Sequence, residues 1–428
     1  MCSDYKKPFI IALIAILCMS AISCEDRQVA QFNPDELNRK LQQITEDYEM
    51  MGLAVMLIAG GEQAYEGYFG QAVYETGREL GPESVFRIAS ITKTVSAIAL
   101  MQLWEQGLVD IDADVSGYLG WELRNPAHPD EIITLRMLLG HTSGIRDGEG
   151  YPAFTRDMIE NRLHIRELFE PDGEYFTADM FADHAPGDFF SYSNATWALV
   201  ASVVERISGE RFDRYTAQHI FEPIGMRASF NPADFRGDEY AVLYRKPDGE
   251  WSAQVDLYTD SEPRDRAWEG YEPGTNGLLY GPQGSLRITG PGLLRLALAL
   301  MNGGELEGGR ILQQATLGEM TRPYWEYDGT NGDTWDDFWM AYGLGIHLIT
   351  NREGKDVIFP DREMFGHAGI AYGLLSDMYV DPSTGSGVIF IMSGSAQEFE
   401  YAEHSAFYEM EAAVFDLLRP VLLKLEGN

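Results

Sequence analysis

The chain has 428 residues, of which 45% are hydrophobic and 12% aromatic, and its 67 acidic residues against 32 basic ones give a formal net charge of −35. This apolar content excludes a disordered chain, and the negative charge disfavours docking to nucleic acid or to an anionic lipid surface. A soluble, acidic, globular protein with one large domain or two interleaved ones remains.

The first residues have the pattern of an export signal. A short basic region at Lys6 and Lys7 precedes an apolar run over 8–17, and small residues follow at 21–23. The apolar run is shorter than the about 20 residues that a membrane-spanning helix needs. We therefore predict that residues 1–23 are a signal peptide removed on export and that 24–32 form a polar tether.

Cysteine occurs only in this leader region, at Cys2, Cys18 and Cys24. The rest of the chain therefore has no thiol for a disulfide or a metal site. Cys24, at the first position after the predicted cleavage, resembles the lipid-bearing cysteine of a bacterial lipobox. We expect an exported protein of the cell envelope or periplasm, touching the membrane only through a lipid at Cys24. A soluble exported protein and a retained leader are the alternatives.

The remaining chain, 33–428, predicts an α+β domain. Asn33 and Pro34 suit the start of a helix, and two glycine-containing turns separate strand-like runs into hairpins at 53–70 and 374–392. A helix with a kink at Pro420 is expected over 407–425. These elements predict an α/β sandwich whose antiparallel sheet combines N- and C-terminal strands under terminal helices. A mostly helical insertion of about 100–340 contributes helices at 135–139, 195–207 and 291–301, after one at 92–106.

Two long aromatic segments, 237–277 and 322–339, are typical of pocket walls, although plain surface loops are possible. The second contains a group of aspartates at 328, 333, 336 and 337 whose spacing does not match a calcium-binding loop, so we expect a solvated acidic loop there. The eight histidines show no paired metal-ligand spacing. No cofactor and no metal are expected.

Ser90 and Lys93 are the first candidate catalytic residues. They stand where a strand-like run, 85–88, gives way to an apolar helix, and residues three apart share one helix face. A lysine at the mouth of a buried helix loses hydration, which favours its neutral, proton-accepting form. A helix cap beside a solvated lysine is the plain alternative, but lysine is scarce here, so chance rarely produces this Ser-x-x-Lys spacing.

Two further motifs accompany it. Tyr192 and Asn194 form a Tyr-x-Asn motif that opens a helix, and His367, Ala368 and Gly369 precede a strand-like segment. In this order the three motifs resemble the serine β-lactamase and penicillin-binding-protein superfamily, in its class C-like branch of β-lactamase-related hydrolases, esterases and D-aminopeptidases. Additional likenesses occur at 138–145, 186–187, 221–226 and 302–304.

The resemblance implies a role for each motif residue. Ser90 would be the nucleophile, Lys93 its activating partner, and Tyr192 the relay of a proton to the leaving group. Asn194 would hold a polar group on the acyl side of the substrate. The oxyanion would lie between the backbone N–H groups of Ser90 and Ile370, beside Gly369. A small molecule or peptide would be the substrate.

One position departs from the family pattern. His367 stands where lactamases and cell-wall peptidases usually carry lysine, and a neutral histidine binds a substrate carboxylate less well. This favours esters, amides or N-terminal peptides, including ones that contain D-amino acids, over β-lactams and C-terminal D-alanine. Arg287 is a candidate to replace the missing charge. His141 is expected to shape the fold rather than to react.

We therefore predict a serine hydrolase. The alternatives are a catalytically idle penicillin-binding-type lipoprotein that binds cell-wall fragments or peptides, and a true β-lactamase or DD-carboxypeptidase. The chain contains no Gly-x-Ser-x-Gly motif, which argues against an α/β-hydrolase.

Overall fold

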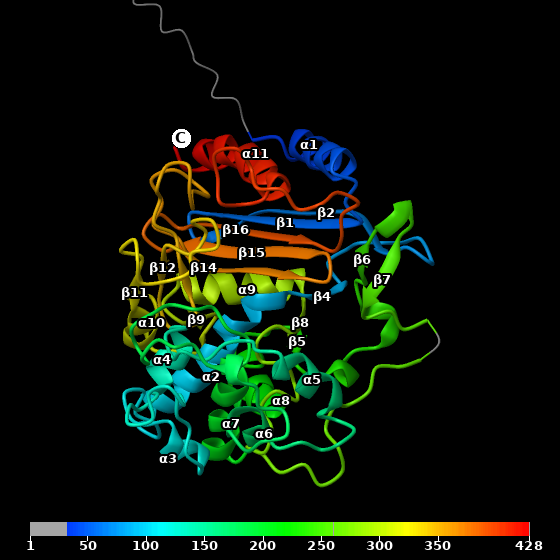
Figure 1. Cartoon of the computed structure of the whole chain (residues 1–428). Helices are drawn as coiled ribbons and strands as arrows, with labels where there is room; N and C mark the ends of the chain where they lie inside the picture. The colour runs from blue at the N-terminus through cyan, green and yellow to red at the C-terminus, as the bar shows by residue number, and fades with distance from the viewer. Residues whose placement is uncertain (1–31, 260, 428) are drawn as a thin grey trace, which may run out of the picture.

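The computed structural model describes residues 32–259 and 261–427. The predicted leader, Cys24 and most of the tether lie outside these residues. Within the described part the largest element is an antiparallel sheet of nine strands (Figure 1), in the order β11-β12-β13-β14-β15-β16-β1-β2-β3. Its strands are β1 (Gly52–Ala59), β2 (Glu62–Val73), β3 (Arg78–Glu79), β11 (Trp325–Glu326), β12 (Ala341–Tyr342), β13 (His347–Leu348), β14 (Phe365–Ala371), β15 (Leu374–Asp381) and β16 (Ser386–Met392).

The two ends of the chain meet in the middle of this sheet. β1 pairs with β16 in a register that places Leu53 opposite Met392. Both predicted hairpins are present as β1–β2 and β15–β16. A third hairpin, β14–β15, turns at Tyr372 and Gly373, whose positive φ angles of 56° and 92° suit a tight two-residue turn.

Helices α1 (Pro34–Asp47) and α11 (Glu409–Glu426) cover one face of the sheet (Figure 1). The side chain of Asn33 caps α1 by accepting a hydrogen bond from the backbone N–H of Asp35 at 3.1 Å. The helix α11 continues through Pro420. The apolar sides of both helices and of the central strands form one of the two main cores.

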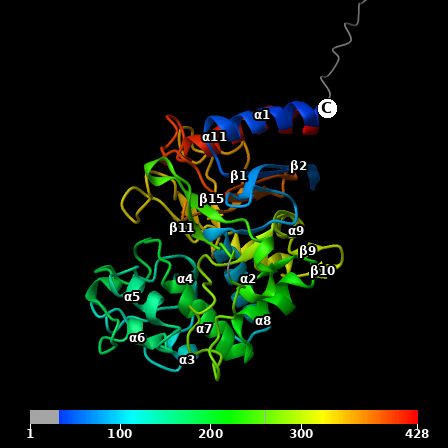
Figure 2. The ribbon, with the colours of Figure 1, turned by 90° about the vertical axis from the view of Figure 1, so that its right-hand side faces the viewer.

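The other face packs on α2 (Thr92–Glu105) and α9 (Gly290–Met301), with the helical region beyond them (Figure 2). α2 is buried nearly all round, as its apolar sequence predicts. The further helices are α3 (Ser116–Leu119), α4 (Leu135–Leu139), α5 (Gly150–Asp157), α6 (Arg166–Phe169), α7 (Thr196–Ser208), α8 (Phe212–Thr216) and α10 (Gln314–Met320). The predicted α+β architecture is confirmed.

Three small sheets lie outside the nine-stranded sheet. They comprise β4 (Val85–Arg87), β5 (Ala228–Ser229) and β8 (Arg287–Thr289); β6 (Leu243–Arg245) and β7 (Ser252–Val255); and β9 (Glu305–Leu306) and β10 (Gly309–Arg310). Among the residues that the structure describes, no helix has the length and apolar content to cross a membrane.

Candidate active site

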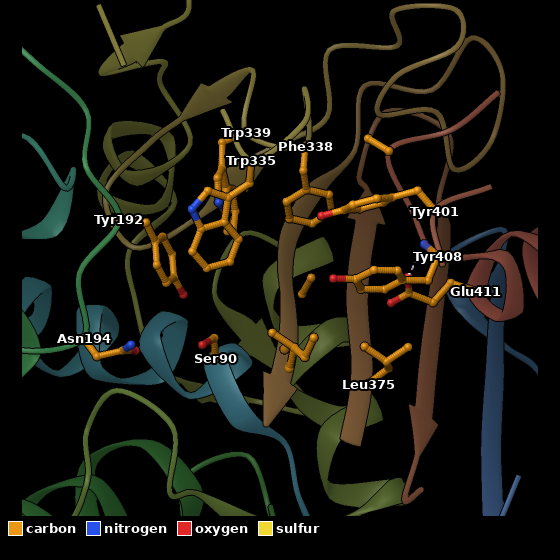
Figure 3. A pocket seen from close by; sticks show the side chains of 14 residues that line it. Ser90, Tyr192, Asn194, Trp335, Phe338, Trp339, Leu375, Tyr401, Tyr408 and Glu411 are labelled. Carbon is orange, nitrogen blue, oxygen red and sulfur yellow. Dashed lines mark hydrogen bonds between the residues drawn. The ribbon is translucent and has the colours of Figure 1, made fainter. Parts of the chain in front are cut away.

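Ser90 lies on a short 3-10 helix, η1 (Ala89–Ile91), between β4 and α2. The preceding residue, Ala89, has a φ of 41°. A non-glycine residue in this left-handed region costs on the order of 1–2 kcal/mol, and such strain is concentrated at functional sites. The turn presents the Ser90 side chain to a cavity below the aromatic segment (Figure 3).

Lys93 is fully buried one turn further along. Its Nζ donates to Ser90 Oγ at 2.9 Å, to Asn194 Oδ1 at 2.8 Å and to the carbonyl oxygen of Gln283 at 2.8 Å. Burial lowers the pKa of the Lys93 amine to about 7, although the negative charge of Asp147 opposes this shift. The amine beside the serine oxygen is therefore able to accept a proton near neutral pH.

Asp147 organises the start of α7 and was not found from the sequence. Its Oδ1 accepts from the backbone N–H groups of Asn194 and Ala195, each at 2.8 Å, and its Oδ2 accepts from Asn194 Nδ2 at 2.8 Å. This arrangement fixes the orientation of the Asn194 amide, so that its oxygen faces Lys93. Asp147 lies in a loop and belongs to no recognisable motif, so no sequence pattern pointed to it.

Tyr192 stands on the other side of Ser90, and its hydroxyl points toward that serine (Figure 3). Lys93 Nζ lies 4.9 Å from the centre of the tyrosine ring. Burial raises the pKa of the Tyr192 hydroxyl, while interaction with the Ser90 side chain opposes the rise. The neutral hydroxyl is therefore the resting form, and it is placed to exchange a proton with the serine oxygen or a leaving group.

His141 packs against the ring of Tyr192. Its ring stacks on the tyrosine ring at 4.4 Å between centroids, and its Nδ1 accepts from the backbone N–H of Ser193 at 3.1 Å. The imidazole is 1% exposed. These contacts agree with the predicted structural role.

The end of β14 runs beside Ser90. A Cβ atom added at Gly369 would lie 2.6 Å from the carbonyl oxygen of Ile88 and 3.0 Å from the Ser90 backbone nitrogen, so only glycine fits there. The next residue, Ile370, is exposed and lines the cavity. This places the backbone of Ile370 and the Ser90 N–H at one end of the cavity, as an oxyanion site requires.

His367 has a different position from the one expected for a substrate-binding residue. It is a fully buried residue of β14, and its side chain does not line the cavity. Its Nε2 accepts from the Tyr342 hydroxyl at 2.9 Å, and its Nδ1 donates to the Ala368 carbonyl at 2.5 Å. Burial, with the nearby charge of Lys93, holds the pKa of the imidazole well below its usual value. It is neutral and already hydrogen-bonded.

Arg287 does not supply the missing charge at the cavity. Its guanidinium is buried on β8 and forms a salt bridge with Asp256 at 2.8 Å. It is absent from the cavity lining. The suggestion that this arginine replaces the family lysine was wrong, because its charge is paired inside the fold with Asp256 of the 237–277 segment.

The cavity is open to solvent on one side, and its lining is mostly apolar. Trp335, Phe338 and Trp339 form one wall, which confirms that 322–339 is a pocket wall. The segment 237–277 contributes no lining residue, and instead carries β6 and β7. The C-terminal residues Tyr401, Tyr408 and Glu411 close the far end and were not predicted. These three residues belong to none of the three motifs, so no sequence pattern pointed to them.

No group of three or more His, Cys, Asp or Glu side chains suited to a metal ion is found in 32–259 or 261–427.

A model of the Beta-lactamase family matches residues 37–409. This chain belongs to that family. A putative penicillin-binding protein, PbpX of Bacillus subtilis (strain 168), is 26% identical over 221 residues, covering 51% of each chain. Esterase EstB of Burkholderia gladioli is 29% identical over 45% of this chain and 50% of its own. The chain spans about half the length of the curated relatives it matches.

Solved structures agree on the fold. EstCE1, described as a hydrolase with promiscuous acyltransferase activity, superposes with a TM-score of 0.66 at 20% identity, over 90% of this chain and 99% of its own. The prediction that this chain belongs to the β-lactamase family is thus confirmed.

Proposed function

We propose that this protein hydrolyses carboxylic esters, and more slowly amides or peptides, through an acyl-enzyme on Ser90. The observation that carries the proposal is the Lys93 amine, fully buried and 2.9 Å from Ser90 Oγ with its pKa lowered to about 7. A desolvated amine in hydrogen-bond contact with a hydroxyl is the arrangement that activates a serine nucleophile.

In the first half-reaction Ser90 Oγ attacks the substrate carbonyl carbon while Lys93 takes the serine proton. The negative charge on the carbonyl oxygen is stabilised by the backbone N–H groups of Ser90 and Ile370. Tyr192 passes a proton to the departing alcohol or amine and regains one from protonated Lys93. In the second half-reaction a water molecule attacks the acyl carbon while Lys93 takes its proton. The bond from the acyl carbon to Ser90 Oγ then breaks as that proton passes to Oγ, which releases the acid and restores Ser90.

The surroundings of Ser90 favour an ester whose acyl group is apolar or aromatic in the part near the reacting carbonyl. Trp335, Trp339 and Phe338 offer an apolar wall for such a group. The neutral, hydrogen-bonded His367 offers no positive charge to a substrate carboxylate. For this reason penicillins and peptides ending in D-alanine are expected to be poor substrates.

Ser90→Ala tests the proposal directly. The variant is expected to lose hydrolysis of a chromogenic heptanoyl ester and to lose the mass adduct that a fluorophosphonate leaves on the wild type. Ser252→Ala, a serine on the distant strand β7, is the control. Unchanged hydrolysis in Ser90→Ala would refute the proposal, and tight binding of peptides without any adduct would favour a binding protein instead. Rapid penicillin turnover by the wild type would refute the argument from His367.

Residues 1–24 support a separate proposal about where the protein is located. The protein is exported and held at the cell envelope by a lipid on Cys24, as the charge and length pattern of residues 1–24 indicates. Metabolic labelling with a fatty acid is expected to mark the wild type and not Cys24→Ala. Labelling of both would contradict the lipid site, and an unprocessed chain in the cytoplasm would contradict export.

A further inference from the structure

The cavity that begins at Ser90 ends at the first turn of α11 (Figure 3). There the rings of Tyr401 and Tyr408 stack at 4.7 Å between centroids, and Phe338 lies across from them on the lining. Glu411 is 4% exposed and is the acidic side chain that lines this end. A carboxyl group at the end of an apolar cavity is costly unless it has a partner of opposite charge.

A second carboxyl group lies next to it. Asp377 is fully buried on β15, two residues after Leu375, and therefore on the face of the strand that Leu375 presents to the cavity. No donor from the described residues reaches either oxygen of Asp377. The group that it contacts is the carboxyl of Glu411. Two buried carboxyl groups thus meet with no cation, since no ion pair among the described residues includes either one.

Burial and this mutual contact change the ionisation of both groups. The pKa of Asp377 is raised well above its usual value, by burial first and then by Glu411. Burial raises the pKa of Glu411 to about 7, and hydrogen bonding opposes the rise. Asp377 consequently keeps its proton, and Glu411 carries the negative charge that the cavity senses near neutral pH.

Helix capping accounts for only one of the two carboxyl groups. Glu411 Oε2 accepts from the backbone N–H of Tyr408 at 2.8 Å, which stabilises the start of α11. Asp377 adds nothing to that cap. Burial of a carboxyl group costs free energy unless it is fully hydrogen-bonded or paired with an opposite charge. The pair therefore has a better explanation in a ligand than in the stability of the fold.

We propose that this end of the cavity binds the primary ammonium group of the substrate, at the end of the acyl chain whose carbonyl reacts with Ser90. The carboxylate of Glu411 accepts hydrogen bonds from the ammonium, and the faces of Tyr408, Tyr401 and Phe338 favour a cation and its methylene chain. The acidic protein as a whole also concentrates cations at its surface. The catalytic part of this inference rests on the proposed ester hydrolysis.

The experiment compares two chromogenic esters of similar shape, one of aminohexanoic acid and one of heptanoic acid. The ratio of their kcat/KM values measures the preference for the ammonium group. In the wild type the ratio is expected to exceed about 10, and in Glu411→Gln to fall to about 1. Glu409→Gln, an exposed residue of the same helical turn, removes the same charge and is expected to keep the wild-type ratio.

A wild-type ratio at or below unity overturns the proposal, as does a high ratio that persists in Glu411→Gln. Measurement in high salt separates the contact from the general field, because salt screens the surface charges and leaves a buried contact largely intact. A high ratio that collapses in salt also overturns it.

Binding without turnover keeps the two proposals distinguishable. Trp335 and Trp339 report on the cavity, so hexylammonium is expected to change the tryptophan fluorescence of Ser90→Ala at concentrations about tenfold lower than hexanol does. If neither ester is hydrolysed but hexylammonium still binds selectively, the ester hydrolysis fails and the ammonium site stands. Equal binding of amine and alcohol overturns the site, and this measurement decides the matter if Glu411→Gln does not fold.

Discussion

Two buried ionisable groups lie at opposite ends of the same cavity and differ in how the fold treats them. Lys93 sits behind Ser90 with three hydrogen-bond acceptors around it, and burial lowers its pKa to about 7. Glu411 has one backbone donor and a second carboxyl beside it, and burial raises its pKa to about 7. Loss of hydration therefore favours a neutral amine at the Lys93 end, whereas at the Glu411 end it leaves a buried carboxyl group without an opposite charge. The Lys93 end has the groups that its proposed reaction needs, and the Glu411 end lacks a cationic partner.

Removal of the base is expected to have the largest effect. Lys93→Met should lower kcat/KM for the heptanoyl ester by about 10³-fold, because Ser90 loses its proton acceptor. Lys40→Met, an exposed lysine of α1, should leave activity unchanged. Lys93→Arg separates base from charge, since arginine stays protonated. Activity near the wild-type level in Lys93→Arg would show that the positive charge, rather than proton transfer, matters.

The pH profile is the second test of the two ends. The neutral form of Lys93 is required, so kcat/KM for the heptanoyl ester should rise about tenfold per pH unit below pH 7 and level off above it. Asp147, Tyr192 and Asn194 face the amine; the charge of Asp147 opposes its deprotonation. A profile flat from pH 5 to 8 would contradict a titrating base.

For the aminohexanoyl ester the rise should be steeper, because Glu411 must also ionise. The groups that face Glu411 are Asp377 and Tyr379 on β15 and Tyr408 at the start of α11. Of these, the two tyrosines have pKa values raised by burial and stay neutral over this range. If the pH profiles of the two esters had the same slope, ionisation of Glu411 would not affect turnover of the aminohexanoyl ester, and the contrast between the two ends would fail.

Asp147→Asn should have a smaller effect. The amide still accepts from the backbone N–H groups just before α7 but places a second NH₂ group against Asn194, so kcat/KM should fall about tenfold. Because the charge that favours protonated Lys93 is lost, the acid limb of the pH profile should move to lower pH. The exposed Asp130→Asn is the control. A fall in activity with no shift of that limb would mean that Asp147 acts only on structure.

The smallest effect concerns stability. Asp377 and Glu411 hold protons in the folded state at pH values where unfolded carboxyl groups, with pKa values of about 4, have lost theirs. Their contribution is therefore present at low pH and is lost as the pH rises through 7. Asp377→Asn replaces a donor that depends on a bound proton with an amide that needs none, so the free energy of unfolding at pH 8 should rise by about 1–2 kcal/mol, with less change at pH 5.

Urea unfolding at both pH values measures this difference, with Glu409→Gln as the control expected within about 0.5 kcal/mol of the wild type. Destabilisation of Asp377→Asn at pH 8 would mean that the acid pair supports the fold and would remove the contrast with Lys93.

The sequence alone predicted the fold class, the family and the residues that gather around Ser90. These features are local: a serine and a lysine three apart share a helix face, the Tyr-x-Asn motif opens the next helix, and alternating or apolar runs mark the strands. Each is set by spacing along the chain, and the structure brings Ser90, Lys93, Tyr192, Asn194 and Gly369 together.

The tertiary structure decided what each side chain faces. His367 and Arg287 carry suitable chemistry by residue type, yet hydrogen bonds and an ion pair inside the fold occupy both. Asp377 and Glu411 are 34 positions apart (411 − 377) and show no motif, and only the packing of α11 on β15 places their carboxyl groups together. Sequence spacing fixes neighbours within one element, whereas burial and contacts between elements depend on how the layers pack.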